Sequence, residues 1–195
     1  MTRRRVVRLC AGAALCSLLA LSCSDQGDAG GGAQPASAVA TDPAMSAEVP
    51  RIAATLFFAS PDGRTLVPVL REVALAEGLV PQGRAILTAQ LQGPPPPYGA
   101  VLPPGTHLRA FYVTERGDAF VDLSFDADAR RVVGTSAELL AVYAIVHTVT
   151  ANLPTIQRVQ ILIDGREADT LAGHVDLRRP LEADMSRVRA ADSTR

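Results

Sequence analysis

Three histidines, His107, His147 and His174, are the side chains of this 195-residue chain best suited to acid–base or metal chemistry. None has a second histidine or a cysteine at the spacing of a zinc ligand pair, so the sequence predicts no metal site. His174 lies two residues before Asp176 and is the one candidate base beside an acid. We favour a turn residue bonded to backbone there, and a packed or half-exposed helical ring for His147.

Three carboxylates in the stretch Asp122–Asp128, DLSFDAD, resemble a loose cation loop. The glycine and the final glutamate of a calcium loop are absent, and Asp122 falls on a predicted strand, so we expect a solvated strand end. No nucleophile–base pair, paired carboxylates or glycine-rich phosphate loop after a strand stands out. The sequence therefore predicts no catalytic residue, no cofactor and no enzymatic activity.

Cys23 has the clearest chemical context in the chain. It follows three consecutive arginines from Arg3 and an apolar run, Leu9–Leu21, that is too short to span a bilayer comfortably, as in a secretory signal peptide. The segment ALSC resembles the lipobox of bacterial lipoproteins, although Ala20 lies where leucine is expected. This resemblance implies removal of residues 1–22 and acylation of Cys23; the alternative is an ordinary signal peptide with an incidental cysteine.

Residues 23–50 are rich in Gly, Ala, Ser and Pro and cannot bury enough apolar surface to fold, so we expect a flexible membrane tether. Its average reach is roughly 28 Å. Cleavage also removes Cys10 and Cys16, which leaves one thiol and no internal disulfide. The formal net charge of −1 becomes about −5 without the four arginines of residues 1–22, which argues against nucleic acid as a partner.

Strand and helix patterns alternate through the remaining part, residues 51–182. Period-2 alternation, helical spacing and turn residues predict a strand at 51–60, a strand at 65–75, a helix at 80–93, a hairpin at 107–126, a helix at 134–155, a strand at 158–165 and a final strand or extended arm at 171–181. The order β-β-α-β-β-α-β, with two amphipathic helices that each need an apolar surface, predicts an α+β domain. We expect a mainly antiparallel or mixed sheet with both helices on one face, and a disordered tail at 183–195.

Several local features refine this expectation. The first strand is apolar on both faces, which is typical of an interior strand, whereas Pro68 indicates an edge or a bulge in the second. Thr135 and Glu138 match a capping box at the start of the second helix. Leu139, Val142, Tyr143, Val146 and Val149 predict one apolar stripe along that helix.

Glycines and prolines mark the connections. Gly63, Gly117 and Gly165 each follow a polar residue at a predicted turn, where positive φ is expected. The stretch GPPPPYG at 93–99 is either a stiff connector, which we favour, or a polyproline ligand for an aromatic groove. Tyr98 and Tyr112 are candidates for a binding face or for core and edge packing.

Seven segments occur in the order seen in GerMN domains, the sporulation and spore germination domains of bacterial envelope lipoproteins. They are FFASPDGRTLVPVLREV, LQGPPPP, LPPGTHL, GDAFVDLS, AVYAIVHTVT, VQILIDG and LAGHVD. The most telling are Leu91–Pro94, Leu102–Thr106 and Val159–Gly165. The resemblance covers about residues 53–181, and it implies a ring-building type of fold, docking to protein partners and no enzymatic activity.

The expected protein is therefore lipid-anchored through Cys23 on the exported face of the cell membrane or outer membrane. Its domain is expected to bind an envelope protein or a second copy of itself, in a role related to sporulation or germination. The alternative is a module that binds peptidoglycan or another wall glycan, although three tyrosines and no tryptophan make such a groove hard to build.

Overall fold

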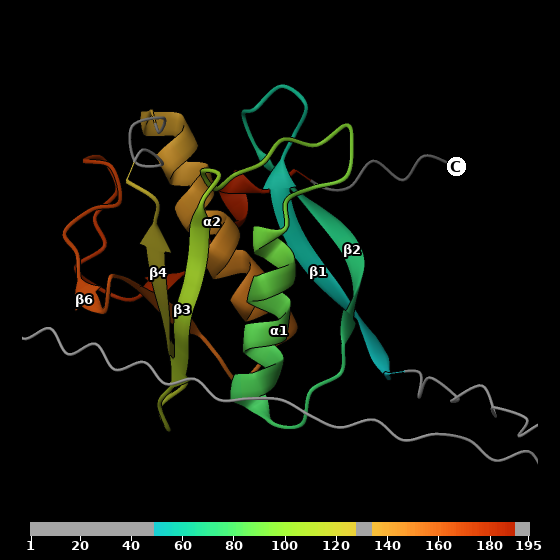
Figure 1. Cartoon of the computed structure of the whole chain (residues 1–195). Helices are drawn as coiled ribbons and strands as arrows, with labels where there is room; N and C mark the ends of the chain where they lie inside the picture. The colour runs from blue at the N-terminus through green and yellow to red at the C-terminus, as the bar shows by residue number, and fades with distance from the viewer. Residues whose placement is uncertain (1–48, 128–133, 190–195) are drawn as a thin grey trace, which may run out of the picture. The chain divides into compact units, whose positions relative to one another are not determined.

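The strands of the domain form two separate sheets (Figure 1). The computed structural model describes residues 49–127 and 134–189, so the signal peptide, Cys23, nearly all of the tether and Asp128 lie outside the described residues. One sheet is an antiparallel ribbon of β1 (Arg51–Ala59) and β2 (Leu66–Ala74). The other has the order β3-β4-β5-β6, with β7 also paired to β5; its strands are β3 (Thr106–Val113), β4 (Asp118–Phe125), β5 (Arg158–Ile163), β6 (Arg166–Glu167) and β7 (Leu181–Glu182).

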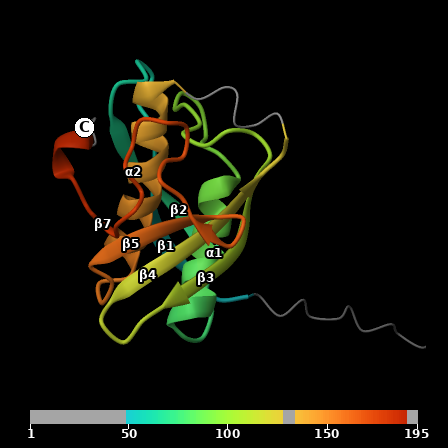
Figure 2. The same ribbon diagram turned by 90° about the vertical axis from the view of Figure 1, so that its left-hand side faces the viewer.

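Two antiparallel helices, α1 (Leu79–Leu91) and α2 (Thr135–Asn152), lie between these sheets (Figures 1 and 2). Both pack on one face of the larger sheet, where α1 contacts β3 and α2 contacts β5. Their other sides contact the β1–β2 ribbon. The predicted α+β class and element order are confirmed, but the division of the strands into two sheets was not predicted.

The larger sheet is mixed because β4 and β5 run parallel while its other pairs are antiparallel. Parallel neighbours need a long crossover, and α2 supplies it. The alternating apolar side chains of β4 and β5 face the helices and are buried: Ala119, Val121, Leu123, Val159, Ile161 and Ile163. The period-2 pattern of the sequence therefore placed this core face correctly.

The expectation that β1 is an interior strand is wrong, because β2 is its one neighbouring strand among the described residues. Its other edge is closed by two side-chain amides instead of a strand. Asn152 Oδ1 accepts from the N–H of Thr55 at 2.8 Å, and its Nδ2 donates to the Thr55 carbonyl at 2.7 Å. Gln90 repeats this with Phe57, at 3.1 and 2.7 Å. Each carboxamide thus satisfies a main-chain donor and acceptor as a neighbouring strand would.

Gly99 completes the same edge with main-chain bonds. Its N–H donates to the Ala59 carbonyl at 2.9 Å, and its carbonyl accepts from the Ala59 N–H at 3.0 Å. These bonds attach the end of the stretch 93–99 to the top of β1, which supports the connector interpretation. Tyr98 is partly buried against the core, whereas Tyr112 is exposed on β3.

Two expectations for α2 are wrong. Its N-cap is Gly134 with no side-chain hydrogen bond, so Thr135 and Glu138 form no capping box. Its buried residues also surround most of the helix rather than one stripe, and they include Leu140, Ala141, Ala144 and Ile145. The reason is position: α2 is covered by β1, by α1 and by β5, so a single apolar stripe would leave polar groups buried.

The expectation of a disordered tail at 183–195 is wrong for residues 183–189. Met185–Arg187 form a short 3₁₀ helix, and Val188 makes a parallel bridge with Leu66 of β2. The Arg189 N–H donates to the Leu66 carbonyl at 2.8 Å, and the Arg189 guanidinium pairs with Asp62 at 3.0 Å. Of the segment expected to form a final strand or extended arm at 171–181, only its last residue, Leu181, belongs to a paired strand, β7.

The turn predictions hold. Gly63, Gly117 and Gly165 have φ values of 67°, 82° and 78°, which favour glycine. Gly117 is also sterically required, because a Cβ there would lie 2.6 Å from the Thr155 carbonyl oxygen. Pro68 lies on β2, the outer strand of the ribbon, as predicted for an edge.

Replacing Gln90 with leucine should destabilise the domain by about 3 kcal/mol, because the buried N–H and carbonyl of Phe57 lose their partners. Thr148, whose hydroxyl donates to Gln90 Oε1 at 2.9 Å, loses an acceptor as well. Urea unfolding measures the change. The matched control is Gln92→Leu at the exposed position after α1, where less than about 0.5 kcal/mol is expected. Equal effects of the two substitutions would contradict the role assigned to Gln90.

Candidate functional site

Glu138 is the most unusual ionisable residue of the described chain. It projects from the first turn of α2, is fully buried, and accepts hydrogen bonds from the loop 168–180, here called the strap, which joins β6 to β7. The donors are the backbone N–H groups of four strap residues, Leu171, Ala172, His174 and Val175, at 2.7–3.2 Å. Figure 2 shows the strap lying beside the N-terminal half of α2.

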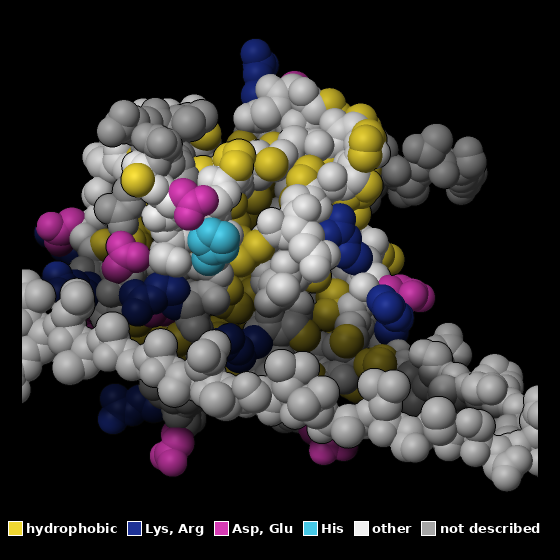
Figure 3. All heavy atoms as spheres, in the orientation of Figure 1, with side chains coloured by type: hydrophobic (Ala, Val, Ile, Leu, Met, Phe, Trp, Pro, Cys, Tyr) yellow, Lys and Arg dark blue, Asp and Glu magenta, His cyan; other side chains and the backbone are white. Residues whose placement is uncertain are grey.

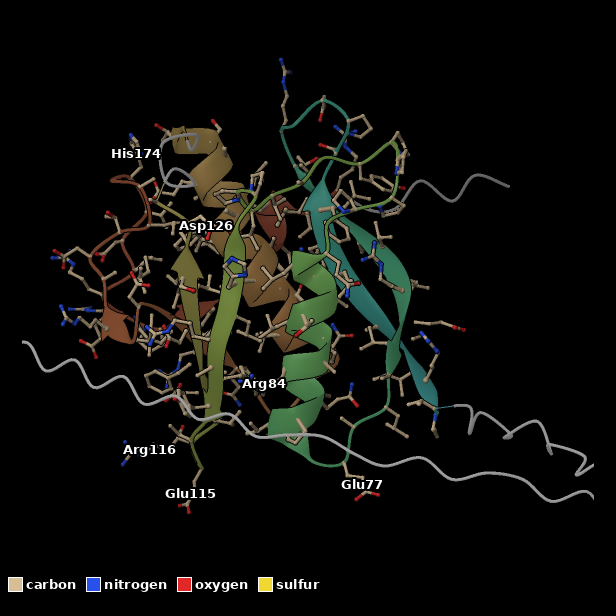
Figure 4. The ribbon with its side chains drawn as sticks, in the orientation of Figure 1. Glu77, Arg84, Glu115, Arg116, Asp126 and His174 are labelled. Carbon is tan, nitrogen blue, oxygen red and sulfur yellow. The ribbon has the colours of Figure 1, made fainter. Side chains whose placement is uncertain are left out.

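The ring of His174 provides a fifth contact to the same carboxylate. Its Nδ1 lies 2.9 Å from Glu138 Oε2, and the side chain remains 45% exposed. Figure 4 shows His174 projecting from the strap at the edge of the molecule. Asp176, the acid expected near this histidine, instead forms an ion pair with Arg178 at 2.7 Å, which lowers the pKa of Asp176. His174 was expected to be a turn residue bonded to backbone. That expectation is wrong for its ring, which contacts the Glu138 carboxylate instead.

The bonds around Glu138 determine its charge state. Burial raises the pKa of the carboxyl, but the backbone N–H groups of Ala172, Val175 and His174 and the His174 ring together lower it below its ordinary value of 4.5. The four backbone partners of the two oxygens are all N–H donors, which favours the ionised carboxylate. Glu138 is thus held as a carboxylate whose work is to fix the strap, rather than as a proton donor.

Asp122 is the second buried acid, and its expected position at a solvated strand end is wrong. It lies inside β4 at 4% exposure and accepts from the Gly165 N–H at 2.8 Å, while the Arg109 guanidinium lies 3.8 Å away. The carboxylate therefore fixes the β5–β6 turn. Asp126, by contrast, is exposed beyond the end of β4 (Figure 4).

The other two histidines also have structural partners. His147 is buried at 2% exposure, its Nε2 lies 3.0 Å from the Asp184 carbonyl, and its ring packs against Phe57 and Tyr143. Burial lowers its pKa, which favours a neutral ring that donates through Nε2. The packed ring expected for His147 is confirmed. His107 is exposed and lies 3.4 Å from Asp126.

The described residues contain no group of three or more His, Cys, Asp or Glu side chains that could hold a metal ion. An apolar cavity of about 200 Å³ lies beside the loop that joins α1 to β3, and it is lined by residues that include Phe58, Leu91, Val101 and Leu102. Hydrophobic side chains gather at this end of the molecule (Figure 3). In the described part of the chain, no helix combines the length and apolar character that crossing a bilayer requires.

The sequence matches the family model Germane, described as sporulation and spore germination, over residues 55–169. The chain belongs to the Germane family. The match begins inside β1 and ends after β6, so it includes both helices and every strand except β7 and the start of β1. The predicted relationship to sporulation and germination proteins is confirmed. A search of curated proteins found no match.

Three solved structures are similar to this chain. The tandem GerMN domains of the sporulation protein GerM from Bacillus subtilis align with 18% identity and a TM-score of 0.51, over 69% of this chain and 46% of that one. The first GerMN domain alone aligns with 18% identity and a TM-score of 0.49, over 68% and 96%. A candidate lipoprotein from Clostridium perfringens aligns with 25% identity and a TM-score of 0.49, over 69% and 89%.

Glu138→Gln should destabilise the Germane domain by about 3 kcal/mol, because the glutamine N–H₂ group would face backbone donors and the buried charge-assisted bonds would be lost. Urea unfolding at neutral pH measures the free energy. The control is Glu167→Gln on β6, whose exposed side chain should contribute less than about 0.5 kcal/mol. A loss no larger than that of the control would contradict the role of Glu138.

The effect of Glu138→Gln should also depend on pH. The folded-state pKa of Glu138 lies below 4.5, so the unfolded chain binds its proton first as the pH falls. The stabilisation is therefore complete above that value and is lost as the pH falls through the lower folded pKa. The difference in unfolding free energy between wild type and Glu138→Gln should shrink over this acidic range. A difference that stays constant to the lowest pH at which both proteins fold would contradict this linkage.

Proposed function

We propose that this protein is a lipid-anchored component of the bacterial envelope, and that its Germane domain is a non-catalytic module that docks protein partners. Cys23 is the anchor in this proposal, residues 23–50 are the tether, and the exported face of the cell membrane or outer membrane is the location. The proposal extends the family's link to sporulation and germination by assigning a mode of action.

The observation that carries the proposal is how the buried ionisable groups are used. Glu138 and Asp122 each accept backbone N–H groups, and the ring of buried His147 contacts a backbone carbonyl, so these three groups serve loops and turns. General acid–base chemistry needs such a group to face a substrate. Exposed apolar side chains are available for recognition, and they include Leu70 on β2 and Tyr112 on β3, at 73% and 57% exposure.

Cys23→Ala should abolish membrane attachment, because several acyl chains at about 0.8 kcal/mol per buried methylene supply the binding energy. Cells fed radiolabelled palmitate should label the wild-type protein and not the variant. The wild type should fractionate with membranes until detergent is added, whereas the variant should not fractionate with them. Ser24→Ala is the matched control and should retain label. Labelling that survives Cys23→Ala would contradict the anchor.

Sedimentation and crosslinking distinguish a domain that docks proteins from one that binds the wall glycan. The detergent-solubilised protein is mixed with isolated peptidoglycan sacculi and centrifuged; we expect it to remain in the supernatant. A photo-crosslinking residue at Leu70 in cells should give adducts that protease removes and a glycan hydrolase leaves unchanged. Sedimentation with sacculi, together with adducts that the hydrolase releases, would overturn docking in favour of the wall-glycan alternative.

A further inference from the structure

The free edges of the two sheets differ in how far they are protected against pairing with another strand. The inner edge of β1 is closed by Gln90, Asn152 and Gly99. The outer edge of β3 is interrupted by a bulge between Leu108 and Ala110, where Arg109 brings a charge. The far edge of β5 is covered by β6 and β7, which have two residues each. Bulges, charges and short strands all hinder strand addition.

The outer edge of β2 has a different character. The bond from the Leu75 N–H to the Pro50 carbonyl sets the alternation of the antiparallel ribbon, so the main-chain groups of Leu66, Pro68, Leu70, Glu72 and Ala74 point away from β1. Two flanking contacts agree with this assignment: the Leu66 carbonyl accepts from Arg189, and the Ala74 carbonyl accepts from Gln82 at 3.3 Å.

Within the described part of the chain, the C-terminal segment pairs with the start of this edge. Val188 and Arg189 pair in parallel with Leu66. The next outward residue is Pro68, which has no N–H to continue a ladder. No described residue bonds the outward main-chain groups of Leu70 or Glu72. The Leu70 side chain beside them is 73% exposed.

We propose that residues 68–72 of β2, whose outward edge no described residue pairs with, pair with the same stretch of a second copy of this chain, as antiparallel strands related by a two-fold axis at Leu70. This names the partner of the docking module and rests on the proposed function. The four hydrogen bonds are the Leu70 N–H to the partner's Leu70 carbonyl, the Glu72 N–H to the partner's Pro68 carbonyl, and their symmetric equivalents.

The composition of the edge selects this occupant and this register. Centring on Leu70 brings two exposed leucines together and requires no donor from Pro68. It also sets each Glu72 opposite a proline, whereas centring on Glu72 would set two carboxylates directly opposite each other. The exposed face of the ribbon carries both Arg51 and Glu72, so it has no single charge that would select a strongly charged peptide.

The pairing is short, so it is expected to be weak in dilute solution and to need concentration on a membrane. Five residues per copy bury far less than the 1,200–2,000 Å² typical of stable complexes. Attachment of both copies to one surface through a tether of roughly 28 Å average reach raises their effective concentration.

The test is disulfide crosslinking of full-length Leu70→Cys in intact cells treated with an oxidant. Cα atoms of a hydrogen-bonded antiparallel pair lie about 5.5 Å apart, within the range that a disulfide spans. A dimer band should appear on non-reducing gels. Tyr112→Cys, on β3 at a position that is also exposed (57%), should give at least about tenfold less, and the wild type reports any contribution of Cys23.

A second substitution tests the backbone pairing itself. Glu72→Pro in the Leu70→Cys background removes an outward N–H that β1 does not use, so the ribbon should fold while the dimer falls about tenfold. Glu72→Ala keeps the N–H and should leave the dimer unchanged.

Three results would each overturn the proposal. They are equal amounts of dimer from Leu70→Cys and Tyr112→Cys, a dimer that Glu72→Pro does not reduce, and adducts only with another protein. Adducts with another protein would leave the docking function standing, and loss of palmitate labelling alone would contradict only the anchor.

Discussion

The carboxamides of Gln90 and Asn152 complete the hydrogen bonding of β1 where no neighbouring strand is present. A carboxamide offers one acceptor and one donor in nearly the arrangement of a peptide group, so it can close a strand edge inside a protein. The two amides project from the C-terminal ends of antiparallel helices and bind alternate residues of β1. The position of the ribbon on the helical layer is thereby fixed by directional bonds as well as by apolar packing. The two-sheet architecture depends on this closure, because an open β1 edge would leave buried polar groups unsatisfied.

A buried carboxylate has a comparable role at the N-terminal end of α2. Glu138 binds four backbone N–H groups of a strap that has no regular secondary structure of its own. A single side chain on a rigid helix thus satisfies four of the strap's backbone N–H groups. Among the described residues, no buried side-chain nitrogen or oxygen lacks a hydrogen bond. The polar interior of the Germane domain is therefore used for construction, which is consistent with a surface devoted to binding.

Much of the fold was predictable because it depends on local periodicity. The alternation of β4 and β5, the turn glycines and the length of α2 each follow from neighbouring residues. The long-range polar bonds were not predictable, because a buried Gln90 looks the same in sequence as a solvated glutamine. Glu138 was misassigned since Thr-x-x-Glu is also a capping pattern, and its true partners lie 33–37 residues away. The position of Asp122 was also predicted wrongly, because its partner Gly165 is 43 residues away in the sequence.

Native-state hydrogen exchange measures the closure of β1 most directly. At protein concentrations too low for pairing, the N–H groups of Thr55 and Phe57 should be protected to nearly the same free energy as that of Leu56, which bonds within the ribbon. The outward N–H groups of Leu70 and Glu72 should exchange many times faster. Fast exchange at Thr55 and Phe57, with Leu56 still protected, would contradict the account by showing that the carboxamides do not hold the strand.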